Sequence, residues 1–450
     1  MSDVMTGKVQ PKGFKASGAS VLAMALVTAG FGLASLSVPT VAFAQDASTE
    51  TDARNAKVDD FRPEPGDTVR DREQPAYDAK GLNWGAATFF PSLTVKQSFT
   101  SNLYKEATNT RADLITTIAP GVRADLDLGR HSASLEVGSD ILRHWDNSTE
   151  DIENVALNSS GRFEFLQSLI FEPNARAEWS HEDRSSPDDP NTDSPTAFQT
   201  LEAGFEGQYK PNRISIEPEF TITHLDYEDG STGGVVTNND DRDRLEVGGG
   251  VKVGYEIVPA YTAFVRFESD ARIYDSALDD AGVDRDSLGG RIEVGTDLEI
   301  SNLLLGELSA GYLVRSYDDG ALDTIQGASF GGNLYWYVTP LITIFGGIER
   351  SVSETTTAGS SGILKTTGNI GADYEFKRNV LFGLNFSYGH DDYSGVNRVD
   401  RLMTVGGTVD WKINPYLEVN GGVDYSDKGS DVGTSEYDDV TTFVGVKFKL

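Results

Sequence analysis

Residues 440–450, VTTFVGVKFKL, alternate between two kinds of side chain at the end of the chain. Successive side chains of a β-strand point to opposite faces, so one face of this segment is largely apolar and the other mostly polar. The first face carries Val440, Thr442, Val444, Val446, Phe448 and Leu450. Such a strand suits lipid on one side and water on the other, as the closing strand of a transmembrane β-barrel must. A soluble β-sandwich can end on a similar strand, so the rest of the chain decides between these folds.

The connections between alternating segments fall into two length classes. From Trp84 onward, short connections such as 128–130 and 210–213 alternate strictly with long, acidic ones such as 183–196 and 228–241. Outer-membrane barrels have short periplasmic turns at one rim and long extracellular loops at the other, whereas a sandwich has no reason for this asymmetry. We therefore predict an all-β fold, a transmembrane antiparallel up-and-down β-barrel of about 18 strands with both termini in the periplasm.

The inner face of the predicted barrel is charged. In segment 261–274, for example, Val265 and Phe267 would face lipid while Arg266 and Glu268 would face the lumen. The candidate lumen-lining residues are Arg266, Glu268, Asp270, Arg272, Arg291, Glu293, Arg315, Tyr335 and Tyr337. A barrel of roughly 16 to 18 strands encloses water, so these walls suggest a path for polar solutes that mildly favours cations. Alternatively, many of the charges pair across strands and stiffen the wall.

Composition excludes several classes of function. The chain has no cysteine, which rules out disulfides and thiolate metal sites. Its 70 acidic residues against 38 lysines and arginines argue against nucleic acid as a partner, because phosphate binding requires a basic surface. No segment after the N-terminal region is apolar for long enough to form a membrane helix, so a bilayer-spanning chain must be a barrel.

The N-terminal region divides into two parts before the barrel. Residues 1–44 combine a lysine-containing start, an apolar run and an Ala-Phe-Ala exit, and are predicted to be a cleaved signal peptide. Residues 45–83 are charged, contain prolines and lack apolar periodicity, so we expect a flexible, acidic periplasmic segment. A docking segment for a periplasmic partner is the alternative. Residues 84–450 form the predicted outer-membrane barrel.

Catalytic motifs are absent from the sequence. The five histidines show no zinc-ligand spacing, and neither a nucleophile elbow nor a phosphate-binding loop is present. We therefore expect no enzyme activity, no catalytic or cofactor-binding residues, no cofactor and no metal. A serine and a histidine brought together across strands would leave no signature in the sequence spacing. The acidic loops at 238–241 and 279–280 could bind calcium, although such clusters are more often solvated loops.

Three segments resemble the β-barrel porin-2 family of bacterial outer-membrane proteins, and the resemblance extends from about residue 74 to residue 450. They are QPAYDAKGLNWGAATFFPSLTVKQSFTSNLY (74–104), NNDDRDR (238–244) and RIYDSALDDAGVDRDSLGG (272–290). The first departs from the family at Ala79, where proline is common, and at Thr100-Ser101, where acidic residues are common. The end of the chain also resembles the C-terminal assembly signal of outer-membrane proteins, with Gly445, Phe448 and Leu450 at its spacing.

The family resemblance implies a role in the export of exopolysaccharide or capsule, with the barrel as a polymer exit along which Tyr335 and Tyr337 could contact sugar. A general diffusion porin for small hydrophilic solutes and a structural barrel with a plugged lumen remain alternatives. The expected location is the cell outer membrane. The expected partners are outer-membrane lipids, the barrel assembly machinery and, for an export role, periplasmic polysaccharide-export proteins.

Overall fold

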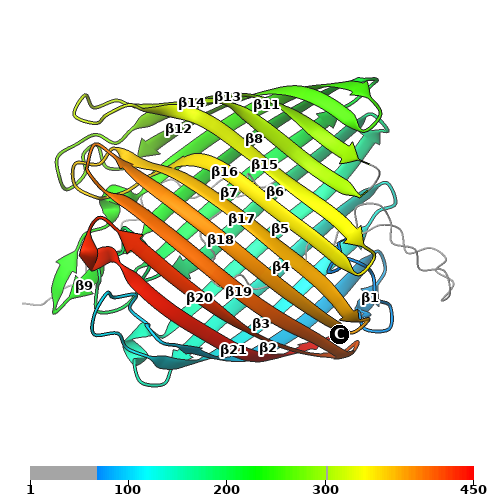
Figure 1. The fold of residues 1–450 in the computed structure, drawn as a ribbon, viewed down its shortest axis with the longest axis horizontal. Helices are drawn as coiled ribbons and strands as arrows, with labels where there is room; N and C mark the ends of the chain where they lie inside the picture. The colour runs from blue at the N-terminus through cyan, green and yellow to red at the C-terminus, as the bar shows by residue number, and fades with distance from the viewer. Residues whose placement is uncertain (1–67, 301–302) are drawn as a thin grey trace, which may run out of the picture.

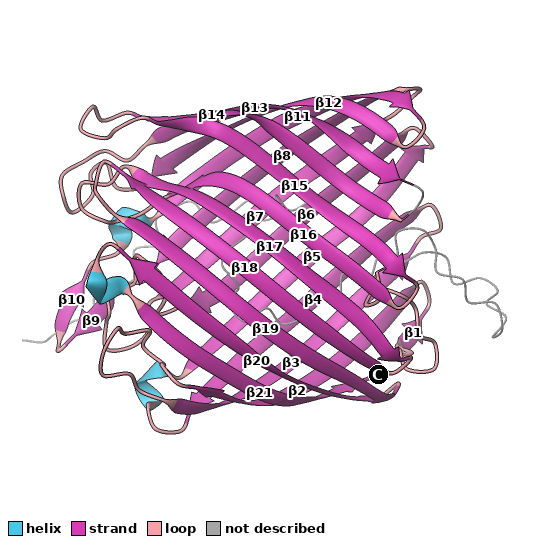
Figure 2. Cartoon of the chain, in the orientation of Figure 1, coloured by secondary structure: helices cyan, strands magenta, loops and turns pink. Residues whose placement is uncertain are grey.

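The chain folds as a closed antiparallel barrel of 18 strands in a computed structural model that describes residues 68–300 and 303–450 (Figures 1 and 2). Each strand pairs with its neighbour in the chain, and the last pairs with the first, as predicted. The barrel strands are β2 (Ala87–Thr100), β3 (Asp113–Asp127), β4 (His131–His144), β5 (Ile152–Leu166), β6 (Leu169–His181), β7 (Ala197–Tyr209), β8 (Ile214–Tyr227), β11 (Arg244–Val258), β12 (Tyr261–Tyr274), β13 (Ser287–Ile300), β14 (Leu304–Tyr317), β15 (Ile325–Thr339), β16 (Ile342–Ser353), β17 (Gly362–Lys377), β18 (Val380–Ser394), β19 (Val399–Asn414), β20 (Leu417–Ser430) and β21 (Tyr437–Lys449).

The small elements lie at the rims of the barrel. A short strand β1 (Leu82–Trp84) extends the sheet beside β2 at the turn end. At the loop end are the hairpin of β9 (Gly230–Thr232) and β10 (Val235–Thr237) and three 3₁₀ turns, η1 (Ser148–Glu150), η2 (Asp240–Arg242) and η3 (Gly433–Ser435). Within the described residues, no helix is both long enough and apolar enough to cross a membrane.

The C-terminal strand closes the barrel. β21 pairs with β20 on one edge and with β2 on the other, from Ser92 opposite Lys449 to Thr100 opposite Thr441. Its two faces differ as predicted. Val444 is 56% exposed on the outer face, whereas a Cβ atom on Gly445 would lie against the Asn420 side chain. The role of this segment as an assembly signal stays a prediction.

The outer face of the barrel is apolar and unpacked by protein. On β13, Leu288, Ile292 and Val294 are all more than half exposed, while Glu293 between the last two is 2% exposed. A soluble protein would leave this band in water, whereas a bilayer covers it with lipid. The exposed tryptophans Trp336 and Trp411 lie near short turns, and Trp145 and Trp179 lie near long loops, as expected of two interfacial girdles.

The structure describes only the end of the region before the barrel. The predicted signal peptide, residues 1–44, and the segment up to residue 67 lie outside the described residues. The part that is described, residues 68–83, is called here the N-terminal segment. Val69 is completely buried, and its N–H donates to Thr343 Oγ1 on β16 at 3.2 Å. These contacts place Val69 against the barrel wall. The flexibility expected of residues 45–83 stays a prediction.

One junction between neighbouring strands is incomplete. β15 and β16 pair from the turn end only as far as Gly331 opposite Glu349. Beyond that point, residues 325–330 still pair with β14, and residues 350–353 still pair with β17. No ladder pair joins these two segments to each other, although the structure describes both. We call the two segments the seam, and in Figure 1 the strands separate toward the loop end.

Candidate functional site in the barrel lumen

A cavity of about 760 Å³ occupies the loop-side half of the lumen. Its lining comes from β7, β8, β11 to β14 and β16 to β21, together with parts of four long loops. The charged side chains reach it because they alternate with lipid-facing ones. On β12, Arg266 and Glu268 flank Phe267, which is 52% exposed on the outer face. The lumen wall is therefore built by the same alternation that makes the outer face apolar.

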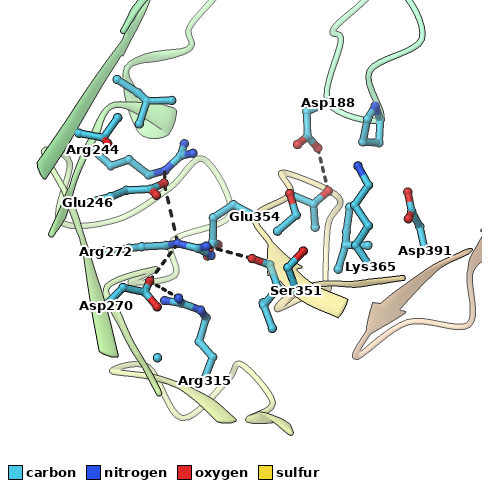
Figure 3. Close-up of a pocket in the computed structure, with 18 of the residues that line it drawn as sticks. Asp188, Arg244, Glu246, Asp270, Arg272, Arg315, Ser351, Glu354, Lys365 and Asp391 are labelled. Atoms are coloured by element: carbon cyan, nitrogen blue, oxygen red, sulfur yellow. Dashed lines mark hydrogen bonds and ion pairs between the residues drawn. The ribbon is translucent and has the colours of Figure 1, made fainter. Parts of the chain in front are cut away.

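A loop-side cluster of charges lies on one side of this cavity (Figure 3). Its members alternate in sign: Arg244, Glu246, Arg272, Asp270, Arg315 and Glu354. Arg244 Nε lies 2.7 Å from Glu246 Oε1, and Arg272 Nε lies 3.8 Å from the same carboxylate oxygen. Asp270 pairs with Arg315 and lies 3.7 Å from Arg272. Three arginines thus face three carboxylates, so the cluster is formally neutral while it presents strong hydrogen-bonding groups.

Arg272 links this wall to a distant strand. Its guanidinium pairs with Glu354 and also donates from Nη2 to the backbone carbonyl of Val352 at 2.9 Å. Val352 is near the end of β16, and Glu354 directly follows that strand. The end of β16 is therefore held toward the inside of the barrel by an arginine of β12.

A mid-barrel cluster lies further toward the turn end. It comprises Lys252, Arg266, Glu268, Arg291, Glu293, Asp297 and Glu307. Arg291 Nη2 lies 2.6 Å from Glu268, Arg266 Nη2 lies 2.6 Å from Glu307, and Lys252 Nζ lies 2.8 Å from Glu307. Three bases meet four carboxylates here, which leaves a formal negative charge. The first pair joins the neighbouring strands β12 and β13, whereas the other two reach across intervening strands to β14. Together these pairs stiffen the wall.

Glu293 is the most enclosed member of the mid-barrel cluster. It accepts hydrogen bonds from the hydroxyls of Ser309 on β14, at 2.8 Å, and Ser329 on β15. Arg266 and Arg291 approach it to 3.7 and 3.9 Å. A carboxylate removed from water in this way requires these partners to remain charged. Glu293 therefore ties three consecutive strands together on the inner face.

The opposite side of the cavity carries fewer charges. Lys365 and Asp391 lie across from the loop-side cluster in Figure 3. Deeper in the wall, Asp400 accepts from the hydroxyl of the almost fully buried Tyr393 at 3.2 Å and lies 3.4 Å from Lys428 Nζ. A polar solute in the cavity would thus meet groups of both signs on both sides.

Two long loops, 182–196 and 354–361, meet across the cavity. Asp188 Oδ1 accepts hydrogen bonds from the Thr355 hydroxyl at 2.7 Å, the Thr356 N–H at 2.8 Å and the Thr356 hydroxyl at 3.0 Å. A single carboxylate oxygen therefore receives three donors from the opposite loop. This contact narrows the loop-side mouth of the lumen.

Arg285 anchors the second of these loops. Its Nη1 donates to the carbonyls of Thr355 at 2.9 Å and Ser360 at 3.4 Å, and its Nε lies 2.7 Å from Asp279. Burial opposes the ionisation of Asp279. The backbone N–H of Val283 and the Arg285 guanidinium outweigh it and hold the pKa of Asp279 below its usual range. The Asp279 carboxylate therefore serves to hold the Arg285 guanidinium in place.

The N-terminal segment binds to the inner wall at the turn end of the barrel. Arg70 lies between two carboxylates, with Nε 2.6 Å from Asp373 and Nη1 2.6 Å from Asp410. Arg72 lies 3.3 Å from Glu375, and both of these side chains are less than 5% exposed. Since the carboxylates belong to β17 and β19, the segment is bound to one side of the barrel wall.

The sequence-predicted residues separate into two groups in space. The structure brings Arg266, Glu268, Asp270, Arg272, Arg291, Glu293 and Arg315 into the two charge clusters. Tyr335 and Tyr337 alternate in phase with the inward Ser329, but they lie near the turn end and are not among the residues that line the cavity. Within the described residues, no group of three or more His, Asp or Glu side chains is arranged to hold a metal ion.

Sequence reasoning missed the groups that come from outside the strands. Glu354, Arg285 and Asp188 lie in long loops, where alternation gives no direction for a side chain. Arg70 and Arg72 lie in a segment expected to be flexible. The sequence did contain one indication of this site. Arg70 and Arg72 are separated by a single residue, and such a pair of arginines is unusual in a region rich in acidic residues.

A family model described as "Putative beta-barrel porin 2" matches residues 74–450. No curated protein sequence matches the chain. Among solved structures, Pseudomonas aeruginosa OpdK with vanillate has a TM-score of 0.45 at 9% identity, covering 80% of this chain and 99% of that chain. OccK3 (OpdO) of the same organism has a TM-score of 0.42 at 11% identity, covering 80% and 95%. Acinetobacter baumannii OccAB3 has a TM-score of 0.42 at 9% identity, covering 81% and 99%.

Proposed function

Because the chain belongs to this porin family of outer-membrane β-barrels, we propose that it is a diffusion channel for small hydrophilic solutes. The solutes enter at the loop end, pass the charged lumen and leave at the turn end. No catalytic step is part of this proposal.

The contact between loops 182–196 and 354–361 is the observation that carries the proposal. With Asp188 bonded to Thr355 and Thr356, the loops leave a cavity of about 760 Å³ on the loop side. Cavities of roughly 300–1,000 Å³ suit single small molecules. The lining of paired arginines and carboxylates favours polar solutes, because apolar ones gain nothing from it.

The charge balance of the lumen supports a mild preference for cations. The loop-side cluster is formally neutral, whereas the mid-barrel cluster has one carboxylate more than its bases. Fixed negative charge along a narrow aqueous path attracts cations and repels small anions. The preference is expected to weaken as salt concentration rises, since ions screen the wall.

Export of a surface polysaccharide has no comparable support among the described residues. That interpretation invoked Tyr335 and Tyr337 as a sliding surface for sugar, yet both lie outside the residues that line the cavity. A polymer would also have to displace the loops that meet at Asp188. Family membership alone does not select a polymer as the solute.

Liposome swelling with purified full-length protein tests the proposed function. Arabinose should enter rapidly, a disaccharide more slowly and a tetrasaccharide hardly at all. Protein denatured before reconstitution is the control and should give no swelling. Equal rates for all three sugars, or no entry of arabinose, would contradict a size-limited diffusion channel.

A deletion strain separates the two transport roles. Surface and secreted polysaccharide should be unchanged by the deletion, while uptake of small hydrophilic solutes should fall and return with the complementing gene. Loss of surface polymer with accumulation in the periplasm would instead establish the export role.

A further inference from the structure

The seam interrupts the wall on the loop side of the barrel. Residues 325–330 of β15 keep their ladder with β14, and residues 350–353 of β16 keep theirs with β17. The two segments form no ladder pair with each other. The ladder of the two strands therefore ends within the sheet, at Gly331 and Glu349, and not at its rim.

Side chains close the seam in place of backbone hydrogen bonds. A Cβ atom on Gly327 of β15 would lie 3.9 Å from Leu364 Cδ2 of β17. A Cβ atom on Gly362 of β17 would lie 3.0 Å from Ile325 Cδ1 of β15. Residues of β17 thus reach β15 past the end of the intervening strand. Apolar contacts of this kind can part without the loss of a hydrogen-bond ladder.

The end of β16 has left the wall because it is bonded to the inside of the barrel. Arg272 binds the Val352 carbonyl and Glu354, and Arg285 binds the Thr355 carbonyl. Arg272 lies on the opposite side of the cavity from Ser351 of β16 (Figure 3), and Arg285 lies in the loop between β12 and β13. The seam is therefore maintained by specific bonds.

The lumen cavity extends to the seam. Its lining includes Ser351, Val352 and Ser353 at the end of β16. The cavity therefore extends to the β16 edge of the seam.

The seam lies at the level of the outer leaflet. On β15, Trp336 marks the interface near the turn end. A membrane strand needs about 9 to 11 residues to cross the hydrocarbon, so the other interface falls close to Gln326. There, Gln326 Oε1 lies 3.2 Å from the hydroxyl of Tyr312 on the outer face of β14.

An interrupted ladder at this depth needs a physical reason. Lipid offers no hydrogen bonds to free backbone groups, so irregular backbone at membrane depth persists only beside protein or a water-filled cavity. We propose that the seam is a lateral passage between the lumen cavity and the outer leaflet. The solutes that fit are small amphiphiles, whose polar end meets the loop-side cluster while their apolar part passes Ile325 and Leu364.

This passage is independent of the axial route for hydrophilic solutes. The two routes share the cavity and differ in their exit. Entry of a sugar into liposomes reports the axial route. Entry of the apolar fluorophore 1-N-phenylnaphthylamine through the outer membrane of a porin-deficient host reports the lateral one.

A disulfide across the seam tests the proposal by closing it. Continuing the register from Gly331 and Glu349 would place Ala328 opposite Val352, and both are in phase with the outer face. The chain has no cysteine of its own, so Ala328→Cys/Val352→Cys gives a single possible disulfide. Oxidation should slow entry of the fluorophore several-fold, and reduction should restore it. Because Val352 lines the cavity that both routes share, arabinose entry does not serve as the control for this pair. Fluorophore entry that is the same in the oxidised and reduced protein would overturn the proposal.

A matched pair in the intact part of the same junction is the control. Trp336 and Ile344 are ladder partners on the outer face, near the turn end. Trp336→Cys/Ile344→Cys should oxidise readily and leave both routes unchanged. An equal slowing of the fluorophore by this pair would show that cross-linking the strands anywhere has the effect, and would also overturn the lateral passage.

A second variant opens the seam and does not depend on disulfide formation. Leu364→Ala removes the side chain that reaches Gly327, and should speed entry of the fluorophore several-fold without changing arabinose entry. Leu384→Ala, which truncates a 66% exposed leucine on the outer face of β18, is its control. If the cysteine pair does not oxidise, the rate of fluorophore entry through Leu364→Ala tests the passage without it. Faster entry supports the passage, and unchanged entry refutes it.

Discussion

The wall formed by β11 to β14 and the junction of β15 with β16 are neighbours in one barrel, yet only the first is continuously paired. The β12–β13 ladder runs from Tyr261 opposite Leu298 to Arg272 opposite Ser287. The β15–β16 ladder stops at Gly331 opposite Glu349. The two regions also differ in their inner faces, because the wall is joined by ion pairs across strands. At the seam, the inner face of β15 carries the uncharged Ile325, Gly327 and Ser329.

This difference shows that strand pairing in the barrel depends on what the inner side chains do. In the wall, charges on adjacent strands bind one another and hold the strands in register. At the seam, the end of β16 is bound through Arg272 to a strand on the other side of the cavity. The same arginine therefore belongs to the intact wall and maintains the break in its neighbour.

The largest effect is expected from removing the carboxylate at the centre of the wall. Glu293→Ala leaves Arg266 and Arg291 with one buried partner fewer and removes a carboxylate acceptor from the hydroxyls of Ser309 and Ser329. We expect the free energy of unfolding to fall by about 3–5 kcal/mol, measured by denaturant unfolding in detergent. The exposed Glu299→Ala on the same strand should change it by less than about 0.5 kcal/mol. Equal effects of the two substitutions would mean that the wall does not rest on its buried charges.

Arg272→Ala should remove the bond that links the β11–β14 wall to the end of β16 at the seam. Without the guanidinium, the Val352 carbonyl and Glu354 lose a donor, and loop 354–361 loses one of its bonds to the wall. We expect a loss of about 2–3 kcal/mol in unfolding free energy and a larger, noisier single-channel conductance in planar bilayers. Lysine cannot make both contacts in the same geometry. The unfolding free energy and conductance of Arg272→Lys should therefore lie between those of the unchanged protein and those of Arg272→Ala. An unchanged conductance would show that this loop does not restrict the channel.

A pair of serines distinguishes the two sides of the seam. Ser329 on β15 donates to Glu293 and is thereby bonded to the wall, whereas Ser351 on β16 lines the cavity. Ser329→Ala should lower the unfolding free energy by about 1–2 kcal/mol, since the buried carboxylate loses a donor. Ser351→Ala should change it by less than about 0.5 kcal/mol in the same detergent assay. A larger loss of unfolding free energy for Ser351→Ala than for Ser329→Ala would contradict the assignment of the stabilising contact to β15.

The smallest effect concerns pH at the loop end of the wall. Burial and the nearby carboxylates of Asp226, Asp240 and Asp275 raise the pKa of Asp243 to about 6, although the Tyr227 N–H partly opposes this. The folded state thus binds this proton more tightly than the unfolded state, whose pKa is about 3.9. Stability should fall as pH rises from about 4 to about 6 and then level off.

Asp243→Asn should remove this part of the pH dependence. The amide oxygen can still accept from Tyr227, so the fold is retained. Because Asp243 is partly exposed, solvent screening should limit the difference to less than about 1 kcal/mol. Unfolding free energies of both proteins at pH 4 and pH 7 measure it. A slope that persists in the variant would assign the proton to another group.

The charged wall was predictable from sequence, whereas its partners were not. Alternation along β12 and β13 predicts that Arg266, Glu268, Arg291 and Glu293 share the inner face, and the structure brings these four side chains into one cluster. Alternation also put Tyr335 on the inner face, but it carries no information about depth along the barrel axis. Its distance from the cavity depends on where β15 begins and ends.

The sequence alone determined a barrel of alternating strands, the asymmetry of its rims and the closing role of residues 440–450. These features are local, since a period of two residues and the length of each connection can be read within a few residues of chain. Only the tertiary structure decided which loops enter the lumen, that Arg70 docks between two distant carboxylates, and that β15 and β16 separate. The reason is physical, because alternation is identical in a paired and an unpaired strand, and the deciding bonds join residues far apart in the chain.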